Sequence, residues 1–226
     1  MPAPTHPFTV RERLSIALGH LNSAQVAESL TQGADPNTLD SQGRSGLRQV
    51  FVALEHAQVN DACARIKIGG EIEASLLRAG ANPNEGWPRD AEGQAGPALA
   101  TVVAQAFTLV SVQLSSAPAQ IDRIAHWMAH GANPNQSTGN LTTYDQWLDE
   151  VMSHAGINDH FDPGVEPLAI GVWQALKTVP VADATLARWC DHYVGLPLDA
   201  LWIAEQRARD LAQAPVASVR RRRQRS

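Results

Sequence analysis

The pentapeptide GADPN at residues 33–37 returns as GANPN at 80–84 and again as GANPN at 131–135. The copies begin 47 and then 51 residues apart. A motif repeated at spacings of this size is typical of an array of similar structural units, in which each unit packs against its neighbours. This recurrence constrains the fold more than any other feature of the sequence.

Each copy follows a segment whose apolar residues recur at helical spacing. These residues are Val26, Ala27 and Leu30 before the first copy, Ile72, Leu76 and Leu77 before the second, and Ile121, Ile124, Ala125 and Met128 before the third. The glycine of each copy stands where a helix cap requires positive φ, and the proline three residues later prevents the helix from continuing. Each copy therefore predicts a helix, a sharp stop and an extended turn.

Further amphipathic stretches lie upstream of those helices, and they predict that the helices form antiparallel pairs. The upstream stretches are roughly 9–20, 46–58 and 97–114, and after the third copy helices are expected at 142–155, 167–178, 183–194 and 198–213, with a loop at 156–166. No segment shows sustained strand alternation. We therefore expect an almost purely helical protein.

The segment GADPNTLDSQGRSGLRQV resembles the ankyrin repeat, whose pattern is G-A-[DN]-x-N, two residues, D-x-x-G, and then T-P-L-H at the next helix. The residues that match are Gly33, Ala34, Asp35, Asn37, Asp40, Gly43 and Leu47, whereas Ser45, Gly46 and Arg48 replace the threonine, proline and histidine. After the second copy Asp90 and Gly93 keep the D-x-x-G relation, and TTYD at 142–145 is similar to the helix opening after the third.

This resemblance implies an all-α fold, namely an ankyrin-like α-solenoid of about three to four helix-turn-helix repeats with lengthened helices and a helical C-terminal cap. The expected organisation is repeats over 1–150, a diverged repeat or cap over 151–214, and a disordered basic tail over 215–226. Ankyrin units usually have about 33 residues. We place the roughly 14 and 18 extra residues in longer helices and in connections such as IKIGGE at 66–71.

The net charge of −5 is unevenly distributed along the sequence, because five arginines lie in the terminal RRRRQRS. Removing them from the 18 basic residues leaves 13, against 23 acidic residues. An acidic body favours a protein partner with a basic surface and does not favour specific nucleic-acid binding. No apolar run is long enough to span a membrane and the first residues lack a secretory pattern, so we expect a cytoplasmic protein.

Three groups of residues raise the alternative of catalysis or metal binding. His154, Asp159, His160 and Asp162 offer nitrogen and oxygen ligands, although their spacing matches no established ligand pattern. Cys190 and His192 lie two residues apart, on different faces of a helix, and we expect both Cys63 and Cys190 to be buried apolar residues. Gly69 and Gly70 lack the rest of a phosphate-binding loop and indicate a break between helical segments. We expect no catalysis and no cofactor.

The tryptophans divide into two classes. Trp127, Trp147, Trp173, Trp189 and Trp202 lie in helical patterns beside aliphatic residues, which predicts that they pack in the core. Trp87 lies instead in the turn insertion NEGWPRD. It either folds back on its own scaffold or anchors a partner, with Arg89 beside it able to bind a carboxylate through two hydrogen bonds.

Stacked repeats create a concave face of turn tips and first helices that suits protein binding. The expected contact residues are those of the turns: Leu39, Asp40, Gln42 and Arg44 in the first, Trp87, Arg89 and Asp90 in the second, and Gln136, Thr138 and Asn140 in the third. The alternative is that they only form the turns and their caps. The resemblance extends to stand-alone bacterial ankyrin proteins, which implies an immunity protein that neutralises a secreted toxin. A secreted effector that targets a host protein, or a metal-dependent enzyme that uses the 154–162 loop, remains an alternative. The oligomeric state stays open.

Overall fold

The computed structural model describes residues 8–55, 61–88, 95–137, 141–154 and 164–192. The described chain is mostly helical, which confirms the all-α prediction. Its helices are α1 (Val10–Gly19), α2 (Ser23–Thr31), α3 (Gly46–Glu55), α4 (Ala62–Arg78), α5 (Ala98–Ser111), α6 (Ala117–Ala129), α7 (Thr143–His154), α8 (Glu166–Leu176) and α9 (Asp183–His192). The helix expected at 198–213 lies outside the described residues.

A small antiparallel sheet interrupts the helices and was not predicted. It joins β1 (Gly86–Pro88) to β2 (Ala95–Pro97), with Trp87 opposite Gly96. Both strands belong to the connection between α4 and α5. With only three residues each, they are too short to show the alternation by which strands are found in a sequence.

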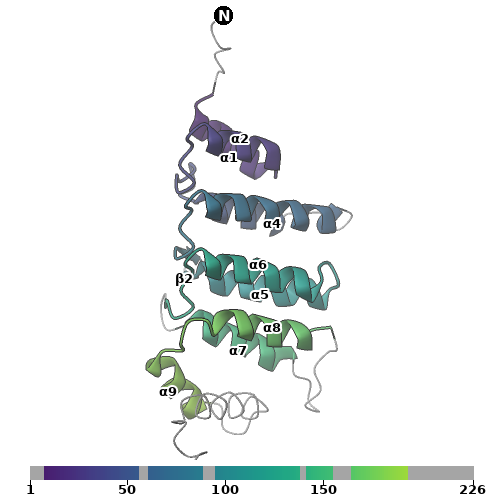
Figure 1. Ribbon diagram of the computed structural model, residues 1–226, viewed down its shortest axis with the longest axis vertical. Coiled ribbons are helices and arrows are strands. Elements are labelled where there is room, and N and C mark those ends of the chain that lie inside the picture. The colour runs from purple at the N-terminus through teal and green to yellow at the C-terminus, as the bar shows by residue number, and fades with distance from the viewer. Residues whose placement is uncertain (1–7, 56–60, 89–94, 138–140, 155–163, 193–226) are drawn as a thin grey trace, which may run out of the picture. The chain divides into compact units, whose positions relative to one another are not determined.

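The helices pack as antiparallel pairs. Contacts divide the chain into two compact units, Met1–Thr185 and Leu186–Ser226, and all the pairs lie in the first unit. Within it α1 contacts α2, α3 contacts α4, α5 contacts α6 and α7 contacts α8. In addition, α2 contacts α4, α4 contacts α6 and α6 contacts α8. Figure 1 shows the pairs following one another along the unit, with the turns that connect one pair to the next all on one side.

The glycine of each pentapeptide ends a helix as predicted. Gly33, Gly80 and Gly131 have φ values of +88°, +93° and +89°. After the first of these helices the amide of Gly33 donates to the carbonyl of Leu30, and the amide of Ala34 donates to Ser29. The same pair of hydrogen bonds recurs after the second and third helices. The shared motif therefore gives these three helices the same end.

The break predicted at Gly69 and Gly70 is wrong, because α4 runs without interruption through both. A Cβ atom at Gly69 would lie 2.7 Å from a methyl carbon of Leu54, so this glycine allows α3 and α4 to approach closely. The IKIGGE segment therefore lengthens a helix instead of connecting two. Cys63, on the same helix, is exposed, which corrects the prediction that it is buried.

The core lies both within the helix pairs and between them. Trp127, Trp147 and Trp173 are buried in it, as predicted. The rings of Trp147 and Trp173 stack with their centroids 4.9 Å apart. Trp189 is only half-buried, and Trp202 and the side chain of Cys190 lie outside the described part of the chain.

Candidate interaction surface

The asparagine that ends each pentapeptide binds the following turn. The Asn37 side chain donates from Nδ2 to the carbonyl of Gly80 at 3.0 Å, and its Oδ1 accepts from the amide of Asn82 at 2.7 Å. Asn84 bonds in the same way to Gly131 and Asn133, and Asn135 to Pro180 and Ala182. We call Asn37, Asn84 and Asn135 the ladder asparagines. Each of them joins two consecutive helix pairs.

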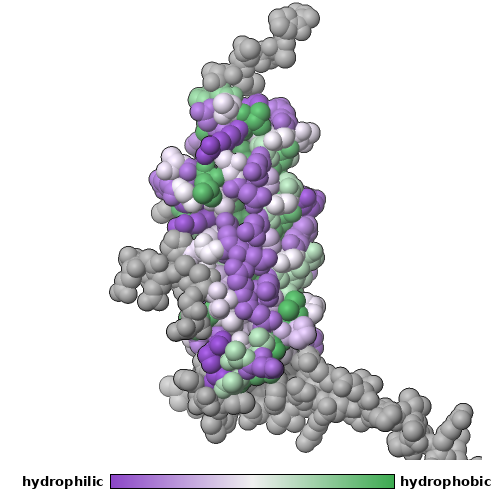
Figure 2. Space-filling model, turned by 90° about the vertical axis from the view of Figure 1, so that its left-hand side faces the viewer, coloured by the Kyte–Doolittle hydropathy of each residue, from purple (hydrophilic) through white to green (hydrophobic). Residues whose placement is uncertain are grey.

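The third residue of each pentapeptide holds the ladder asparagine in place. Oδ1 of Asp35, Asn82 and Asn133 accepts from the amides of Asn37, Asn84 and Asn135 at 2.9, 3.0 and 3.0 Å. Figure 2 views the side on which the turns lie and shows a hydrophilic band along it. Since the ladder carboxamides already bond to the backbone, the polarity of these residues serves the stacking of the helix pairs.

The fourth helix pair keeps this register without keeping the motif. Pro180 takes the place of the glycine, and Ala184 stands where the other turns have a ladder asparagine. Asn135 still bonds to the carbonyl of Pro180 at 2.7 Å and to the amide of Ala182 at 2.8 Å. The pair of α7 and α8 is therefore joined to α6 in the same manner as the earlier pairs are joined to one another.

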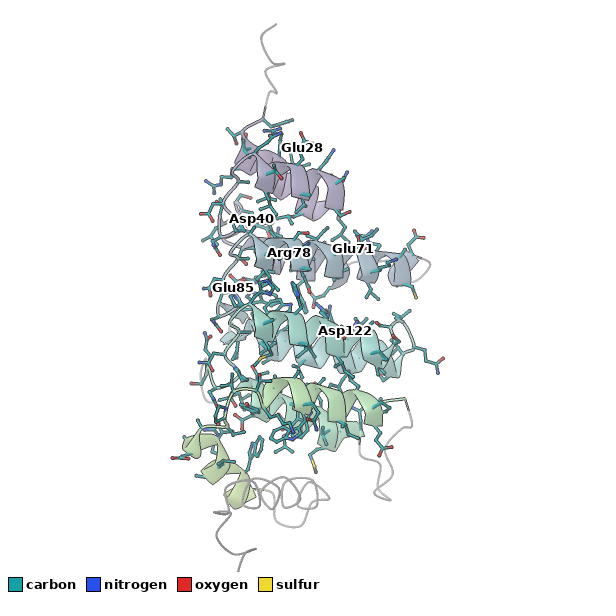
Figure 3. The ribbon with its side chains drawn as sticks, in the orientation of Figure 1. Glu28, Asp40, Glu71, Arg78, Glu85 and Asp122 are labelled. Carbon is teal, nitrogen blue, oxygen red and sulfur yellow. The ribbon has the colours of Figure 1, made fainter. Side chains whose placement is uncertain are left out.

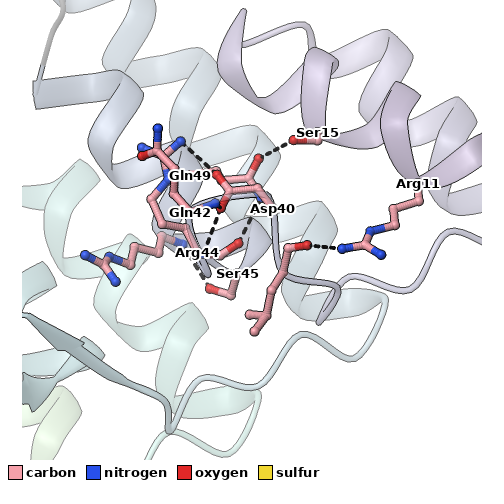
Figure 4. Close-up of polar contacts among 9 residues, drawn as sticks. Arg11, Ser15, Asp40, Gln42, Arg44, Ser45 and Gln49 are labelled. Atoms are coloured by element: carbon pink, nitrogen blue, oxygen red, sulfur yellow. Dashed lines mark hydrogen bonds and ion pairs between the residues drawn. The ribbon is translucent and has the colours of Figure 1, made fainter. Parts of the chain in front are cut away.

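The polar residues predicted in the first turn hold the turn itself. The Asp40 carboxylate accepts from the amides of Gln42 and Arg44 and pairs with the Arg44 guanidinium at 2.7 Å (Figure 4). Burial alone would raise the pKa of Asp40, but the hydrogen bonds from Arg44 and Gln42 and the charge of Arg44 lower it below its ordinary value. Asp40 and Arg44 therefore act within the chain.

A groove of about 620 Å³ opens between α1 and the first turn. Three large apolar side chains that line it are exposed, Phe8 by 51%, Leu39 by 49% and Ile16 by 43%. Polar contacts cross the groove: Arg11 donates to the carbonyl of Leu39, and the Ser15 hydroxyl donates to the Gln49 side chain at 3.0 Å (Figure 4). Of the residues predicted in this turn, Leu39 is the one that presents an apolar side chain to solvent.

The second turn directs its tryptophan into the core. Trp87 is 2% exposed, and its ring centroid lies 5.2 Å from that of Phe51 and 6.1 Å from that of Trp127. Of the two alternatives for Trp87, the structure supports folding back on the scaffold, so the prediction that this side chain contacts a partner is corrected. Trp87 lies on β1, and the pairing of β1 with β2 holds its side chain in the core. Arg89 and Asp90 lie outside the described residues.

The third turn is tied to the second. The Gln136 side chain donates from Nε2 to the carbonyl of Asn84, so this predicted contact residue already has a partner. Thr138 and Asn140 lie outside the described residues. Leu141, which follows them, is 37% exposed and was not among the predicted residues.

A buried ion pair that the sequence analysis missed joins α4 to α6. Arg123 binds both carboxylate oxygens of Glu73 at 2.6 and 2.7 Å, and the two side chains are 9% and 2% exposed. The guanidinium also donates to Gln105 on α5 at 2.9 Å. One signal was readable, because Glu73 lies three and four residues before the apolar Leu76 and Leu77, on the buried face of its helix.

The proposed metal ligands are mostly outside the described part of the chain. Of the four, only His154 is described, and its Nδ1 lies 2.8 Å from the carbonyl oxygen of Glu150. Asp159, His160 and Asp162 are not described, and the described residues contain no cluster of three or more potential metal ligands.

Comparison with known proteins assigns no family. No protein-family model and no curated protein matches this sequence. Among the described helices, none has the length and apolar character needed to cross a membrane. The contacts of the turns and helices are therefore the basis for a functional proposal.

Proposed function

We propose that this protein is an ankyrin-like solenoid of four helix pairs that binds a protein partner in the groove beside its first turn. The repeated ladder of asparagine bonds supports the solenoid, because one type of contact joins each pair to the next. The observation that carries the binding site is the open groove, where Phe8 and Leu39 expose apolar side chains beside hydrogen-bonding groups. Such a combination is typical of anchor sites for a partner's side chain.

The distribution of charge supports a partner with a basic surface. Exposed Glu28, Glu71 and Asp122 come from α2, α4 and α6, one from each successive pair (Figure 3). These carboxylates lie outside the groove, so they act on the approach of a partner, while the groove provides the specific contact. A toxin with a basic surface, neutralised by this protein as its immunity protein, is the specific form of the proposal.

The test compares two exposed apolar residues. Leu39 lies in the groove, whereas Val112 is 55% exposed at the far end of α5. We expect Leu39→Arg to weaken binding of a partner captured from the native cell by about 30-fold or more, as for an anchor residue worth roughly 2 kcal/mol. Val112→Arg is the matched control and should bind like the wild type. The affinities are to be measured with both proteins purified.

Equal affinities for Leu39→Arg and wild type would remove the groove as the binding site. Equal losses in both variants would indicate a general effect of the added charge, which also contradicts the proposal.

A further inference from the structure

The first turn has the same binding groups as the later turns, but it receives no ladder asparagine. In the later turns the carbonyl of the first motif residue and the amide of the third are occupied, as in Gly80 and Asn82. The equivalent groups in the first turn are the carbonyl of Gly33 and the amide of Asp35. Within the described part of the chain no group bonds to either of them. Both residues are exposed.

An exposed apolar surface lies on the same terminal helix pair. Figure 1 shows α1 and α2 at the end of the row of pairs. Ile16, on α1, is 43% exposed, and Phe8, which lies just before the start of α1, is 51% exposed. Both line a space of about 220 Å³ between α1 and α2, together with Arg13 and Glu28. We call Gly33, Asp35, Ile16 and Phe8 together the acceptor end.

We propose that the acceptor end docks a helix pair of a different protein, whose turn presents an asparagine side chain to Gly33 and Asp35. The three occupied turns identify the ligand chemistry. A carboxamide donates to the carbonyl and accepts from the amide, whereas a carboxylate has no donor and an ammonium group no acceptor. The ladder asparagines satisfy both groups at 2.7–3.0 Å, which is the geometry expected of the partner.

A second copy of this chain does not supply that asparagine. The ladder asparagines of a copy bond within the copy, and Ala184 takes the equivalent position after its fourth pair. Alanine has no carboxamide. Among the described residues, a second copy therefore offers no free ladder asparagine, which favours a different chain as the partner.

The acceptor end is also compatible with exposure to water. Arg13 donates to the Gln32 side chain at 2.6 Å, and Gln32 donates to Glu28 at 2.9 Å, so a polar network covers part of this end. A polar outer face keeps the terminal repeat of a stack soluble when nothing is bound. This surface shares Phe8 and Ile16 with the groove of the proposed function, but Gly33 and Asp35 are not part of the groove lining, and the assignment of an asparagine partner depends on the ladder geometry at these two residues.

The experiment supplies a matching helix pair in the same chain. A copy of residues 46–84, followed by a copy of 38–43, is placed directly before Phe8 in place of residues 1–7. The matched control carries alanine at the copied Asn84. Hydrogen exchange by NMR then follows the amide of Asp35 and the helical amides of the added pair. With asparagine we expect exchange of the Asp35 amide to slow by about tenfold or more relative to the alanine control.

Two results would overturn the proposal. One is equal exchange of the Asp35 amide in both variants, and the other is an added pair whose helical amides stay unprotected. If the unextended chain instead protects Asp35 as its concentration and sedimenting mass rise together, the partner is a second copy and the assignment to a different protein is wrong. The Leu39→Arg test is independent of these outcomes, so the groove and the acceptor end can fail separately.

Discussion

The boundary between the first and second helix pairs differs from the boundary between the second and third. At the first boundary the cross-contacts outside the ladder include the bond from Ser15 to Gln49 and the bond from Arg11 to Leu39. A groove of about 620 Å³ remains open there. Here α1 packs against α3 and α2 against α4, and the groove stays open beside these contacts.

The second boundary is closed by large and charged side chains. Trp87 packs against the rings of Phe51 and Trp127, and the Glu73–Arg123 pair at the same boundary is almost fully buried. Both boundaries nevertheless carry the same ladder bonds. The pentapeptide therefore sets how the pairs are joined, and the residues outside it decide whether a groove stays open at a boundary.

Of the substitutions that test the difference between the two boundaries, Trp87→Ala should have the largest effect on stability. We expect Trp87→Ala to lower the free energy of unfolding by about 3–5 kcal/mol, because it leaves a cavity between two aromatic rings. Leu39→Ala, at the open boundary, should stay within about 0.5 kcal/mol of wild type. Urea unfolding of both variants measures the difference. Similar costs for the two would mean that the boundaries are alike.

The buried ion pair gives the next effect. Arg123→Met leaves the Glu73 carboxylate buried without its cation, and we expect a loss of about 3 kcal/mol in the free energy of unfolding. Ser15→Ala, which removes the corresponding polar contact at the first boundary, should cost about 1 kcal/mol. Chemical denaturation of both variants tests whether Arg123→Met lowers the free energy of unfolding more than Ser15→Ala does. The double variant Glu73→Met/Arg123→Met should recover part of the loss, and a double variant less stable than Arg123→Met would contradict this account of the pair.

A ladder asparagine should matter less than either buried contact. Asn84→Ala removes two hydrogen bonds to the backbone of the next turn. Water can then reach the carbonyl and the amide that Asn84 had bonded. We expect a loss of about 1–2 kcal/mol by thermal or urea unfolding. Gln42→Ala is the control, since its exposed side chain makes no hydrogen bond to the described residues. If Asn84→Ala and Gln42→Ala lower the free energy of unfolding equally, the ladder asparagines do not hold the helix pairs together.

The smallest effect concerns the pH dependence of the first turn. The pKa of Asp40 is lower in the folded protein than in the unfolded chain, so its ionised form stabilises the fold above the ordinary aspartate range. That contribution is lost as the pH falls below about 4 towards the folded pKa. The stability advantage of wild type over Asp40→Asn should therefore shrink between about pH 5 and pH 2. An advantage that grows on acidification would reverse the sign of this interaction.

Part of the fold could be predicted because it depends on glycine and proline, whose backbone preferences differ from those of other residues. The glycines with positive φ and the prolines after them mark three helix ends without reference to the rest of the chain. The third joint, between the third and fourth helix pairs, could not be found in this way. There Asn135 donates to the carbonyl of Pro180 and accepts from the amide of Ala182, which are backbone groups that almost any sequence provides.

The candidate site was predicted less well, for a related reason. Whether Trp87 points outward depends on the pairing of 86–88 with 95–97 and on rings from two other helices. Gly69 could likewise be interpreted as a break until its neighbour Leu54 was placed beside it. Leu39 was predictable because an apolar residue in a short polar turn has little nearby to cover it.

The central claim is that one kind of asparagine bond joins all four helix pairs, including the last, where the motif is absent. The most direct measurement is native-state hydrogen exchange of the Ala182 amide in wild type and in Asn135→Ala. We predict that this amide is protected in wild type and exchanges at least about tenfold faster in the variant, while the Asn82 amide is unchanged. Equal exchange of the Ala182 amide in the two proteins would contradict the claim.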